Sequence, residues 1–331
     1  MNPGLFDGYV QAATDPSSLR VHILKIVVVF KNVIARFLSP NAASVPPPIR
    51  RSVTWVPPGH FYSPLVDPDD RHVARILDNL EASILPPDTG VILDDERILA
   101  TLNRISCNYP EMPFSDQKIR GLRYHFRNGA FEQGDGTVYF CMLRDISPKR
   151  VIEVGSGFSS CLIMDTNDRF FNRGIEVKFI EPYPETFNRL TVGDSYYRER
   201  LICSPIQDVP TSVFQTLTAG DILFIDSTHV GKMGSDVNDY LFRILPRLAA
   251  GVLIHIHDIP YPFEYPSDWI RKENRSWNEA YLLRAFLQFN PVFRVIYFNH
   301  YVYKVHRDLL AEKMPKCLEN PGASIWIEKT I

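Results

Sequence analysis

The sequence predicts an α/β protein with a doubly wound, mostly parallel sheet and an N-terminal helical or irregular extension. From residue 150 onward, short apolar segments alternate with stretches of helical periodicity. Because strand–helix–strand connections are right-handed, this alternation produces a parallel sheet with helices on both faces. Many of the 26 prolines lie in the first third of the chain, which indicates irregular structure there. At 331 residues, the chain is long enough for one large domain with an appended region.

The composition excludes several classes of protein. With 45% hydrophobic and 22% charged residues, the chain can bury a core and is not disordered throughout. The net charge of -2 provides no basic surplus for phosphates, so we expect no nucleic-acid partner. The five cysteines form no CxxC pair, which is typical of reduced thiols in a cytoplasmic protein.

Residues 1–50 form the first of three predicted regions, an N-terminal helix followed by a Pro-rich linker. The helix is expected over residues 21–38, where Lys25, Lys31 and Arg36 interrupt an apolar stretch. No uninterrupted run approaches the roughly 18–20 apolar residues that a membrane span needs, so a membrane partner is not expected. We expect an amphipathic helix that packs on the main domain or on a second subunit, which makes a homodimer the predicted assembly. An interfacial membrane helix is the alternative.

The second region, residues 51–133, carries no motif that identifies its role. We expect it to act as a lid, a substrate pocket or a dimerisation region. Helical patterns occur near residues 70–83 and 94–106. A third helical pattern, near 134–145, begins the third region, residues 134–331, which contains the sheet.

Short apolar segments of the third region are the candidate strands. The first, fourth and fifth are nearly continuous apolar runs, as expected for central strands covered by helices on both faces. In a doubly wound sheet, ligands bind beyond the carboxyl ends of the strands, so the residues at those ends form the candidate site. The candidate strands are residues 151–154, 177–180, 201–203, 222–225, 252–257, 293–298 and 324–328.

The first strand runs into a turn with two glycines, Gly155 and Gly157, and then into a helix. Glycines at this spacing let the backbone turn tightly and approach a ligand at the helix N-terminus. The third glycine of a dinucleotide-binding fingerprint would fall at position 160, where the sequence has Ser160. Glu153, two residues before the first glycine, would repel a pyrophosphate. The turn therefore favours a cationic ligand.

Polar side chains follow the other strands as well. Glu181 ends the second strand, in the position where doubly wound nucleotide sites place a carboxylate on a ribose diol. Gln207 follows the third strand, near the expected position of an adenine ring. Asp226 and His229 follow the fourth strand.

The fifth strand completes an Asp/His cluster. His255 and His257 lie two residues apart in it, so they share one face of the sheet. Asp258 lies at the tip of the same strand. Because the carboxyl ends of parallel strands meet at one edge, we expect these residues to lie near Asp226 and His229.

These strand ends resemble the motifs of the class I S-adenosylmethionine-dependent methyltransferases, over about residues 134–330. IEVGSGFSS looks like the first motif of that family, FIEPYPE like its ribose-binding acid and DILFIDSTHV like its fourth motif. FIDSTHVGKMGSDV and GVLIHIHDIPYPFEYP look most like a bacterial small-molecule methyltransferase subgroup. The resemblance implies a Rossmann-like, seven-stranded sheet whose last strand is antiparallel. It also implies S-adenosylmethionine as the cofactor, held by Glu153, Gly155, Ser156, Gly157, Glu181, Gln207 and Asp226.

The activity implied by the resemblance is methyl transfer to a small-molecule acceptor, most favourably at a hydroxyl oxygen. Because the methyl group on a sulfonium is already activated, transfer needs mainly a nucleophile held close and correctly aimed. A hydroxyl nucleophile must also lose its proton. His229 is the candidate general base and Asp226 its candidate catalytic partner. The alternatives are N-methylation, which needs no base of this strength, and a binding protein that has lost the chemistry.

Asp226, His257 and Asp258 are candidate metal ligands. Within the family that the chain resembles, catechol-type methyltransferases hold Mg²⁺ at the ends of these same two strands with carboxylate and amide oxygens. In this sequence His257 takes the place of a hard oxygen ligand, and an Asp/His/Asp set suits Mn²⁺, Fe²⁺ or Zn²⁺ at least as well. A bound metal would orient a substrate oxygen and lower its pKa. In the alternative, Asp226 caps a turn and the histidines pair with carboxylates.

Overall fold

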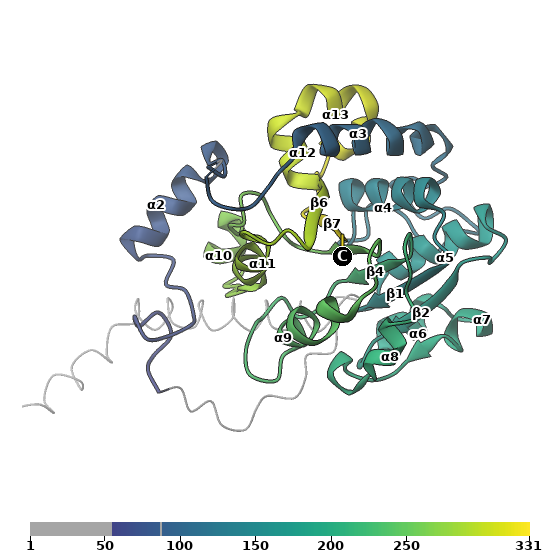
Figure 1. Cartoon of the computed structure of the whole chain (residues 1–331), viewed down its shortest axis with the longest axis horizontal. Helices are drawn as coiled ribbons and strands as arrows, with labels where there is room; N and C mark the ends of the chain where they lie inside the picture. The colour runs from purple at the N-terminus through teal and green to yellow at the C-terminus, as the bar shows by residue number, and fades with distance from the viewer. Residues whose placement is uncertain (1–54, 87) are drawn as a thin grey trace, which may run out of the picture. The chain divides into compact units, whose positions relative to one another are not determined.

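The computed structural model describes residues 55–86 and 88–331, which include a central sheet of seven strands (Figure 1). The strand order is β3-β2-β1-β4-β5-β7-β6, and β7 runs antiparallel to both of its neighbours. The predicted doubly wound, seven-stranded and mostly parallel sheet is thereby confirmed. The strands are β1 (Arg150–Val154), β2 (Glu176–Ile180), β3 (Leu201–Ile202), β4 (Ile222–Ile225), β5 (Leu253–Ile256), β6 (Phe293–Phe298) and β7 (Ile325–Lys329).

The register of the central strands brings their carboxyl ends level. Val154 of β1 pairs with Ile180 of β2 on one side and with Ile225 of β4 on the other. The ladder continues for one more residue, because the Gly155 N–H donates to the Ile180 carbonyl and the Asp226 N–H donates to the Val154 carbonyl. The residues that follow β1, β2 and β4 therefore begin side by side at one edge of the sheet.

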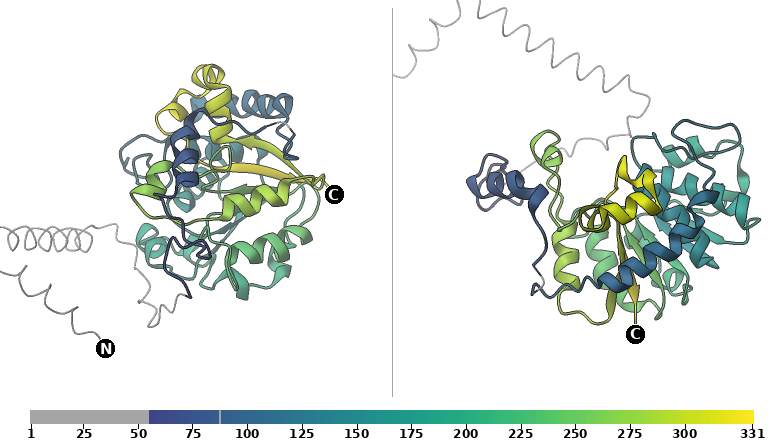
Figure 2. Two further views of the ribbon diagram at one scale, coloured as in Figure 1. Left: turned by 90° about the vertical axis from the view of Figure 1, so that its left-hand side faces the viewer. Right: turned by 90° about the horizontal axis from the view of Figure 1, so that it is seen from above.

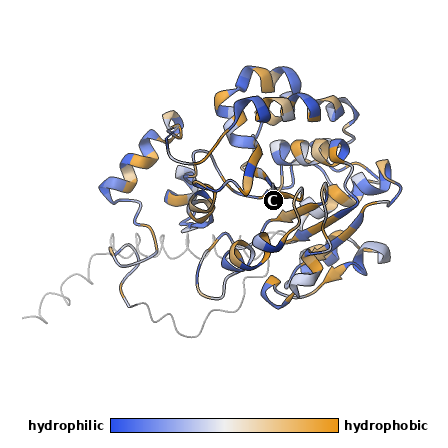
Figure 3. Cartoon of the chain, viewed as in Figure 1, coloured by the Kyte–Doolittle hydropathy of each residue, from blue (hydrophilic) through white to orange (hydrophobic). Residues whose placement is uncertain are grey.

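The helices cover both faces of the sheet. Figures 1 and 2 show α3, α4, α12 and α13 over one face and α9 over the other. Because both faces are covered, central strands bury their side chains on both sides, and all four residues of β4 are apolar and buried. Figure 3 shows the same contrast, with hydrophobic strands inside and hydrophilic helix surfaces outside.

The bounds of the helices agree with the periodicity of the sequence. The patterns near 70–83, 94–106 and 134–145 correspond to α2 with η2, to α3 and to α4. The α-helices are α2 (Arg71–Asn79), α3 (Asp95–Ile105), α4 (Gln133–Ile146), α5 (Phe158–Phe170), α6 (Glu185–Leu190), α7 (Ser195–Arg198), α8 (Thr211–Phe214), α9 (Asp236–Asp239), α10 (Ser267–Arg271), α11 (Glu279–Leu287), α12 (Asn299–Val305) and α13 (Arg307–Lys313). Short turns of other helix types are η2 (Leu80–Ala82), η3 (Ser106–Glu111), η4 (Ile206–Asp208), η5 (Tyr240–Ile244), η6 (Leu245–Arg247) and η7 (Pro315–Leu318).

The segment before α4 shares the core of the sheet. Residues 54–331 form one compact unit. Ile98, Leu102 and Ile105 of α3 are fully buried, and α3 packs on β6 and α4. The predicted role of residues 51–133 as a lid, a substrate pocket or a dimerisation region stays a prediction. The predicted helix over residues 21–38 and its linker lie outside the described residues.

Within the described part of the chain, no helix is long and apolar enough to cross a membrane.

Candidate functional site

The turn after β1 needs its first glycine because of a neighbouring strand. Gly155 has a φ of +82°, and a Cβ added to it would lie 1.6 Å from the backbone carbonyl oxygen of Asp226. Gly157 has extended backbone, and an added Cβ would meet no atom within 4 Å. Gly155 is therefore required by the fold. Gly157 borders open space that a ligand can use.

Glu153 lies beneath this turn, fully buried. Its Oε1 accepts hydrogen bonds from the hydroxyls of Ser159 (2.8 Å) and Ser160 (2.6 Å). Its Oε2 is buried and has no hydrogen-bond partner among the described residues. Burial raises the pKa of Glu153 to about 8, although the two serine hydroxyls oppose the shift. Ser160, which stands where a dinucleotide site has its third glycine, also accepts the N–H of Gly157 (3.1 Å) and so closes the turn.

Glu181 joins the end of β2 to the same turn. Its carboxylate accepts the N–H of Ser156 (3.0 Å) and the N–H of Tyr183 (2.8 Å). Burial raises its pKa, and these two hydrogen bonds oppose the shift. The Ser156 hydroxyl is buried without a partner in the described structure. Gln207 lies on η4 and donates to the Gly234 carbonyl (2.8 Å), so it ties the β3 end to the loop after β4.

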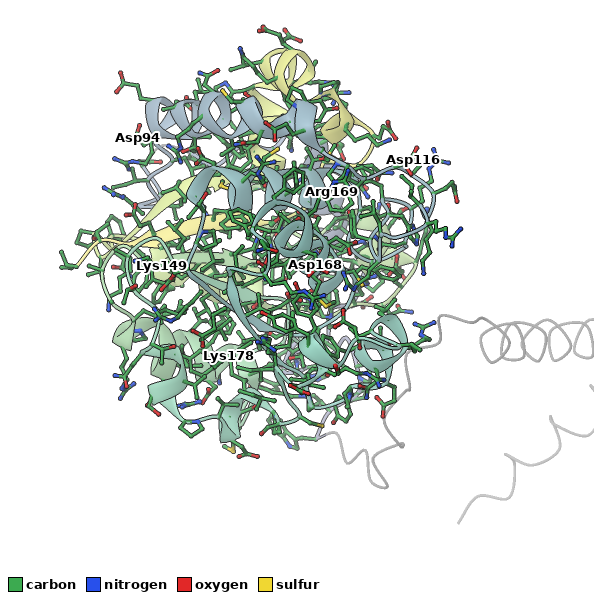
Figure 4. The ribbon with its side chains drawn as sticks, turned by 90° about the vertical axis from the view of Figure 1, so that its right-hand side faces the viewer. Asp94, Asp116, Lys149, Asp168, Arg169 and Lys178 are labelled. Atoms are coloured by element: carbon green, nitrogen blue, oxygen red, sulfur yellow. The ribbon has the colours of Figure 1, made fainter. Side chains whose placement is uncertain are left out.

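Helix α5 is fixed at its opposite end by Arg123. The Arg123 guanidinium bonds Asp165 at 2.7 Å, lies 3.0 Å from Asp168 and pairs with Asp194. Asp165 also accepts the N–H of Tyr124. Asp168, near the C-terminus of α5, is labelled in Figure 4. These contacts anchor α5 to the segment before α4 and so hold its N-terminus at the glycine turn.

Asp226 connects the glycine turn with His229. Its backbone carbonyl lies against Gly155, and its Oδ1 lies 3.5 Å from Nε2 of His229. Asp258, at the end of β5, approaches the same nitrogen with Oδ2 at 3.6 Å. The predicted neighbours of the fourth and fifth strand ends are thus brought together, with the His229 ring between two carboxylates.

A third carboxylate, which the sequence did not single out, contacts the other nitrogen of this ring. Glu279, the first residue of α11, lies 2.7 Å from Nδ1 of His229 and is 1% exposed. Its second oxygen accepts the hydroxyl of Tyr240 at 2.5 Å. We call Asp226, His229, Asp258 and Glu279 the carboxylate–histidine cluster.

The charges of this cluster stabilise the protonated ring. Burial disfavours the cation, but Asp226, Glu279 and Asp258 outweigh it and hold the pKa of His229 well above its usual value. Burial likewise opposes ionisation of Asp226, but His257 and His229 lower the pKa of that carboxyl. In the absence of other ligands, the cluster therefore favours the imidazolium form of His229.

His255 of β5 and His257, the residue after the strand, differ in their surroundings although their rings stack with centroids 5.8 Å apart. His255 stacks on Phe224 at 4.0 Å, and neither of its ring nitrogens has a hydrogen-bond partner among the described residues. Burial and the neighbouring His257 keep its pKa well below the usual value. For His257, burial is outweighed by Asp226, Asp258 and a further carboxylate, Asp135, which raise the pKa.

The predicted metal set of Asp226, His257 and Asp258 does not fit a metal ion. Within residues 55–86 and 88–331, no group of three or more His, Cys, Asp or Glu side chains is arranged to hold one. Asp226 and Asp258 both approach His229, and the Nε2 of His257 lies 3.6 Å from Asp258. The imidazole rings thus balance the carboxylates, which corresponds to the alternative in which the histidines pair with acids.

Comparison with known proteins gives one family match and one relative of substantial identity. A family model described as a methyltransferase domain matches residues 152–259. An uncharacterised protein from Archaeoglobus fulgidus is 39% identical over 168 residues, which cover 49% of this chain and 73% of that protein.

Two solved structures of methyltransferases are also similar. One, from Podospora anserina with S-adenosylhomocysteine bound, is 15% identical, covers 80% of this chain and 97% of its own, and gives a TM-score of 0.37. The other, from Geobacter sulfurreducens, is 16% identical and gives a TM-score of 0.32, and the match covers 78% of this chain and 96% of that chain. At these TM-scores the two likenesses carry no argument about this chain.

Proposed function

Because this chain belongs to the class I S-adenosylmethionine-dependent methyltransferases, we propose that it methylates a hydroxyl oxygen of a small-molecule acceptor with His229 as general base. The observation that carries the proposal is the double role of Asp226. Its carbonyl lies against Gly155 of the glycine turn, and its carboxylate lies 3.5 Å from His229. A single residue thus links the turn proposed to hold the cofactor to a side chain that can take a proton.

The residues at the end of β1 have polar atoms without hydrogen-bond partners in the described part of the chain, which a bound cofactor could engage. The Oε2 atom of Glu153 and the Ser156 hydroxyl have no partner within the described residues, and Gly157 borders open space. We assign Glu153, Gly155, Ser156, Gly157 and Glu181 to cofactor binding, with Gln207 and Asp226 at the edges of the site. When bound, S-adenosylmethionine supplies a methyl group on a sulfonium, which is already activated for displacement. A neighbouring cation would favour the ionised form of Glu153, and Glu181 suits a pair of hydroxyls.

His229 takes the acceptor's proton in this proposal. Its ring is 5% exposed and is held from both sides by carboxylates, so the imidazolium formed by proton transfer is stabilised where it forms. The ring of His229 becomes neutral only when the pH exceeds its raised pKa. The rate of hydroxyl methylation is therefore expected to rise with pH above neutrality.

The same electrostatics favour N-methylation as the second candidate. A histidine that holds its proton at neutral pH is a weak base there, and an amine acceptor needs no base of this strength. The rate of amine methylation would then follow the ionisation of the amine. Replacement of His229 would leave that rate nearly unchanged.

The experiment that tests the function uses purified protein, S-adenosylmethionine and matched panels of hydroxyl and amine acceptors, with products identified by mass spectrometry. Methylated hydroxyl products whose formation depends on His229 would support the proposal. Methylated amines formed equally well by wild type and by H229A would replace it with the second candidate.

We also propose that the protein is a cytoplasmic homodimer, as its composition and the apolar residues 21–38 indicate. Light scattering on the full chain and on residues 49–331 at matched concentration tests the assembly. A dimer that becomes a monomer on truncation supports it, and a full-length monomer contradicts it.

A further inference from the structure

We propose that Glu279 is a positioning residue for His229, which holds the ring with its proton on Nδ1 and leaves Nε2 as the nitrogen that accepts a proton. The inference deepens the proposed function and rests on it for the role of His229 as base. Nothing in the motifs of the chain points to Glu279, which lies 50 residues after His229.

The two ring nitrogens of His229 have different surroundings. Nδ1 lies 2.7 Å from Glu279, a short charge-assisted hydrogen bond. Nε2 lies 3.5 Å from Asp226 and 3.6 Å from Asp258, both longer than an ordinary hydrogen bond. An ionised carboxylate accepts and does not donate, so the short contact requires a proton on Nδ1. When the ring is neutral, the lone pair is therefore on Nε2.

Both carboxylate oxygens of Glu279 are engaged by partners. One oxygen accepts from His229 and the other accepts from the hydroxyl of Tyr240 at 2.5 Å. It is also the first residue of α11, where the helix dipole favours a negative charge. The carboxylate is thus satisfied without help from solvent, although the side chain is buried.

The residues around Glu279 hold the rest of His229. His229 has a φ of +61°, in the left-handed region that costs energy for a residue with a side chain. Its carbonyl accepts the N–H groups of Asn278 (3.1 Å) and Glu279 (3.2 Å), and Trp277 packs on its ring with centroids 4.2 Å apart. The Asn278 side chain bonds both the N–H and the carbonyl of Gly231. The start of α11 therefore fixes the backbone, the ring face and one nitrogen of His229.

The test compares Glu279→Gln with the matched control Glu264→Gln. A glutamine at 279 keeps the shape, but its amide N–H donates to Nδ1 and so favours the other tautomer. We expect kcat to fall about 10–100-fold, the range for residues that orient a reacting group, with the KM for S-adenosylmethionine within twofold of wild type. Glu264 is half-buried and accepts a hydrogen bond from the hydroxyl of Tyr281. Tyr281 lies on α11, two residues after Glu279. Glu264→Gln should retain the wild-type kcat.

A second measurement reads the tautomer directly. Nitrogen-15 NMR of the ring, at a pH at which His229 is neutral, should show the proton on Nδ1 in wild type and on Nε2 in Glu279→Gln. A wild-type proton on Nε2 overturns the proposal without any variant. So does a Glu279→Gln protein with wild-type kcat, or one that binds S-adenosylmethionine much more weakly in calorimetry, since the latter indicates a structural role.

Kinetics of the double variant separate this inference from the proposed function. If Glu279 acts through His229, then H229A with E279Q is no slower than H229A alone. A further loss equal to that of the single variant overturns the positioning role. If H229A keeps its full kcat, the general-base proposal fails, and the tautomer measurement alone decides whether Glu279 orients the ring.

Discussion

The two halves of the site differ in how their acidic side chains are paired. At the end of β1, polar atoms of Glu153 and Ser156 are buried without partners among the described residues. At the ends of β4 and β5, each carboxylate of the carboxylate–histidine cluster lies close to a ring nitrogen of His229. The comparison indicates that the first half is arranged to receive polar groups from a ligand. The second half is arranged to hold one protein side chain.

Replacing His229 tests the second half with the largest expected effect. H229A should lower kcat by about 10²–10⁴-fold, the usual contribution of a general base, while calorimetry shows S-adenosylmethionine affinity near wild type. The control H306A removes a histidine that pairs with Asp95, away from the cluster, and should leave kcat unchanged. Full activity of H229A at neutral pH would remove His229 from the reaction.

Substitutions at the two glycines of the turn should affect different properties, stability at Gly155 and cofactor affinity at Gly157. Gly155→Ala should lower the free energy of unfolding by about 3 kcal/mol or more, because its Cβ would overlap the Asp226 carbonyl at a backbone φ of +82°. Gly157→Ala should unfold like wild type, since its Cβ meets open space, but should bind the cofactor more weakly.

Denaturant titration and calorimetry on both proteins provide the measurement. A Gly155→Ala protein as stable as wild type would show that the turn does not depend on this glycine. A Gly157→Ala protein with unchanged affinity would place the cofactor elsewhere.

The fold and the first half of the site could be predicted because their signals are local. Strand β6 was expected over the residues that it occupies, since an apolar run of β-formers needs no distant information. Glu153 meets Ser159 and Ser160 within seven residues, and Glu181 follows its strand directly. Spacing along the chain therefore sufficed.

The second half could be predicted only in part: Asp226, His229 and Asp258 were expected together, and Glu279 was not. Glu279 reaches His229 across 50 residues, and at the start of α11 it is typical of any helix N-terminus. The sequence could not decide the metal question, because the residue types at the strand ends are the same for a metal site and for a histidine between carboxylates. Only the three-dimensional distances distinguish the two. The reason for Gly155, a carbonyl on a neighbouring strand, is also visible only in the fold.

Removing Glu181 tests the first half with a smaller effect. Glu181→Ala should weaken S-adenosylmethionine binding by roughly 1.5–3 kcal/mol, the range for hydrogen bonds to a charged group, with kcat retained at saturating cofactor. Glu176→Ala, at the opposite end of β2, is the matched control and should bind like wild type. Equal affinities of the two variants in calorimetry would contradict the assignment of Glu181.

The smallest expected effect concerns the pH dependence of stability, which Glu153 controls in the first half. Its pKa is about 8 in the folded protein because of burial, against about 4.3 for an unperturbed glutamate. Between these values the native state binds a proton that the unfolded chain has lost, so stability falls as pH rises. From pH 6 to pH 8 this group should lower the free energy of unfolding by about 2 kcal/mol. Glu153→Gln, which keeps the acceptor for Ser159 and Ser160 but does not titrate, should lose that dependence. Urea unfolding of both proteins at several pH values measures it, and parallel curves would show that Glu153 is already ionised in the free protein.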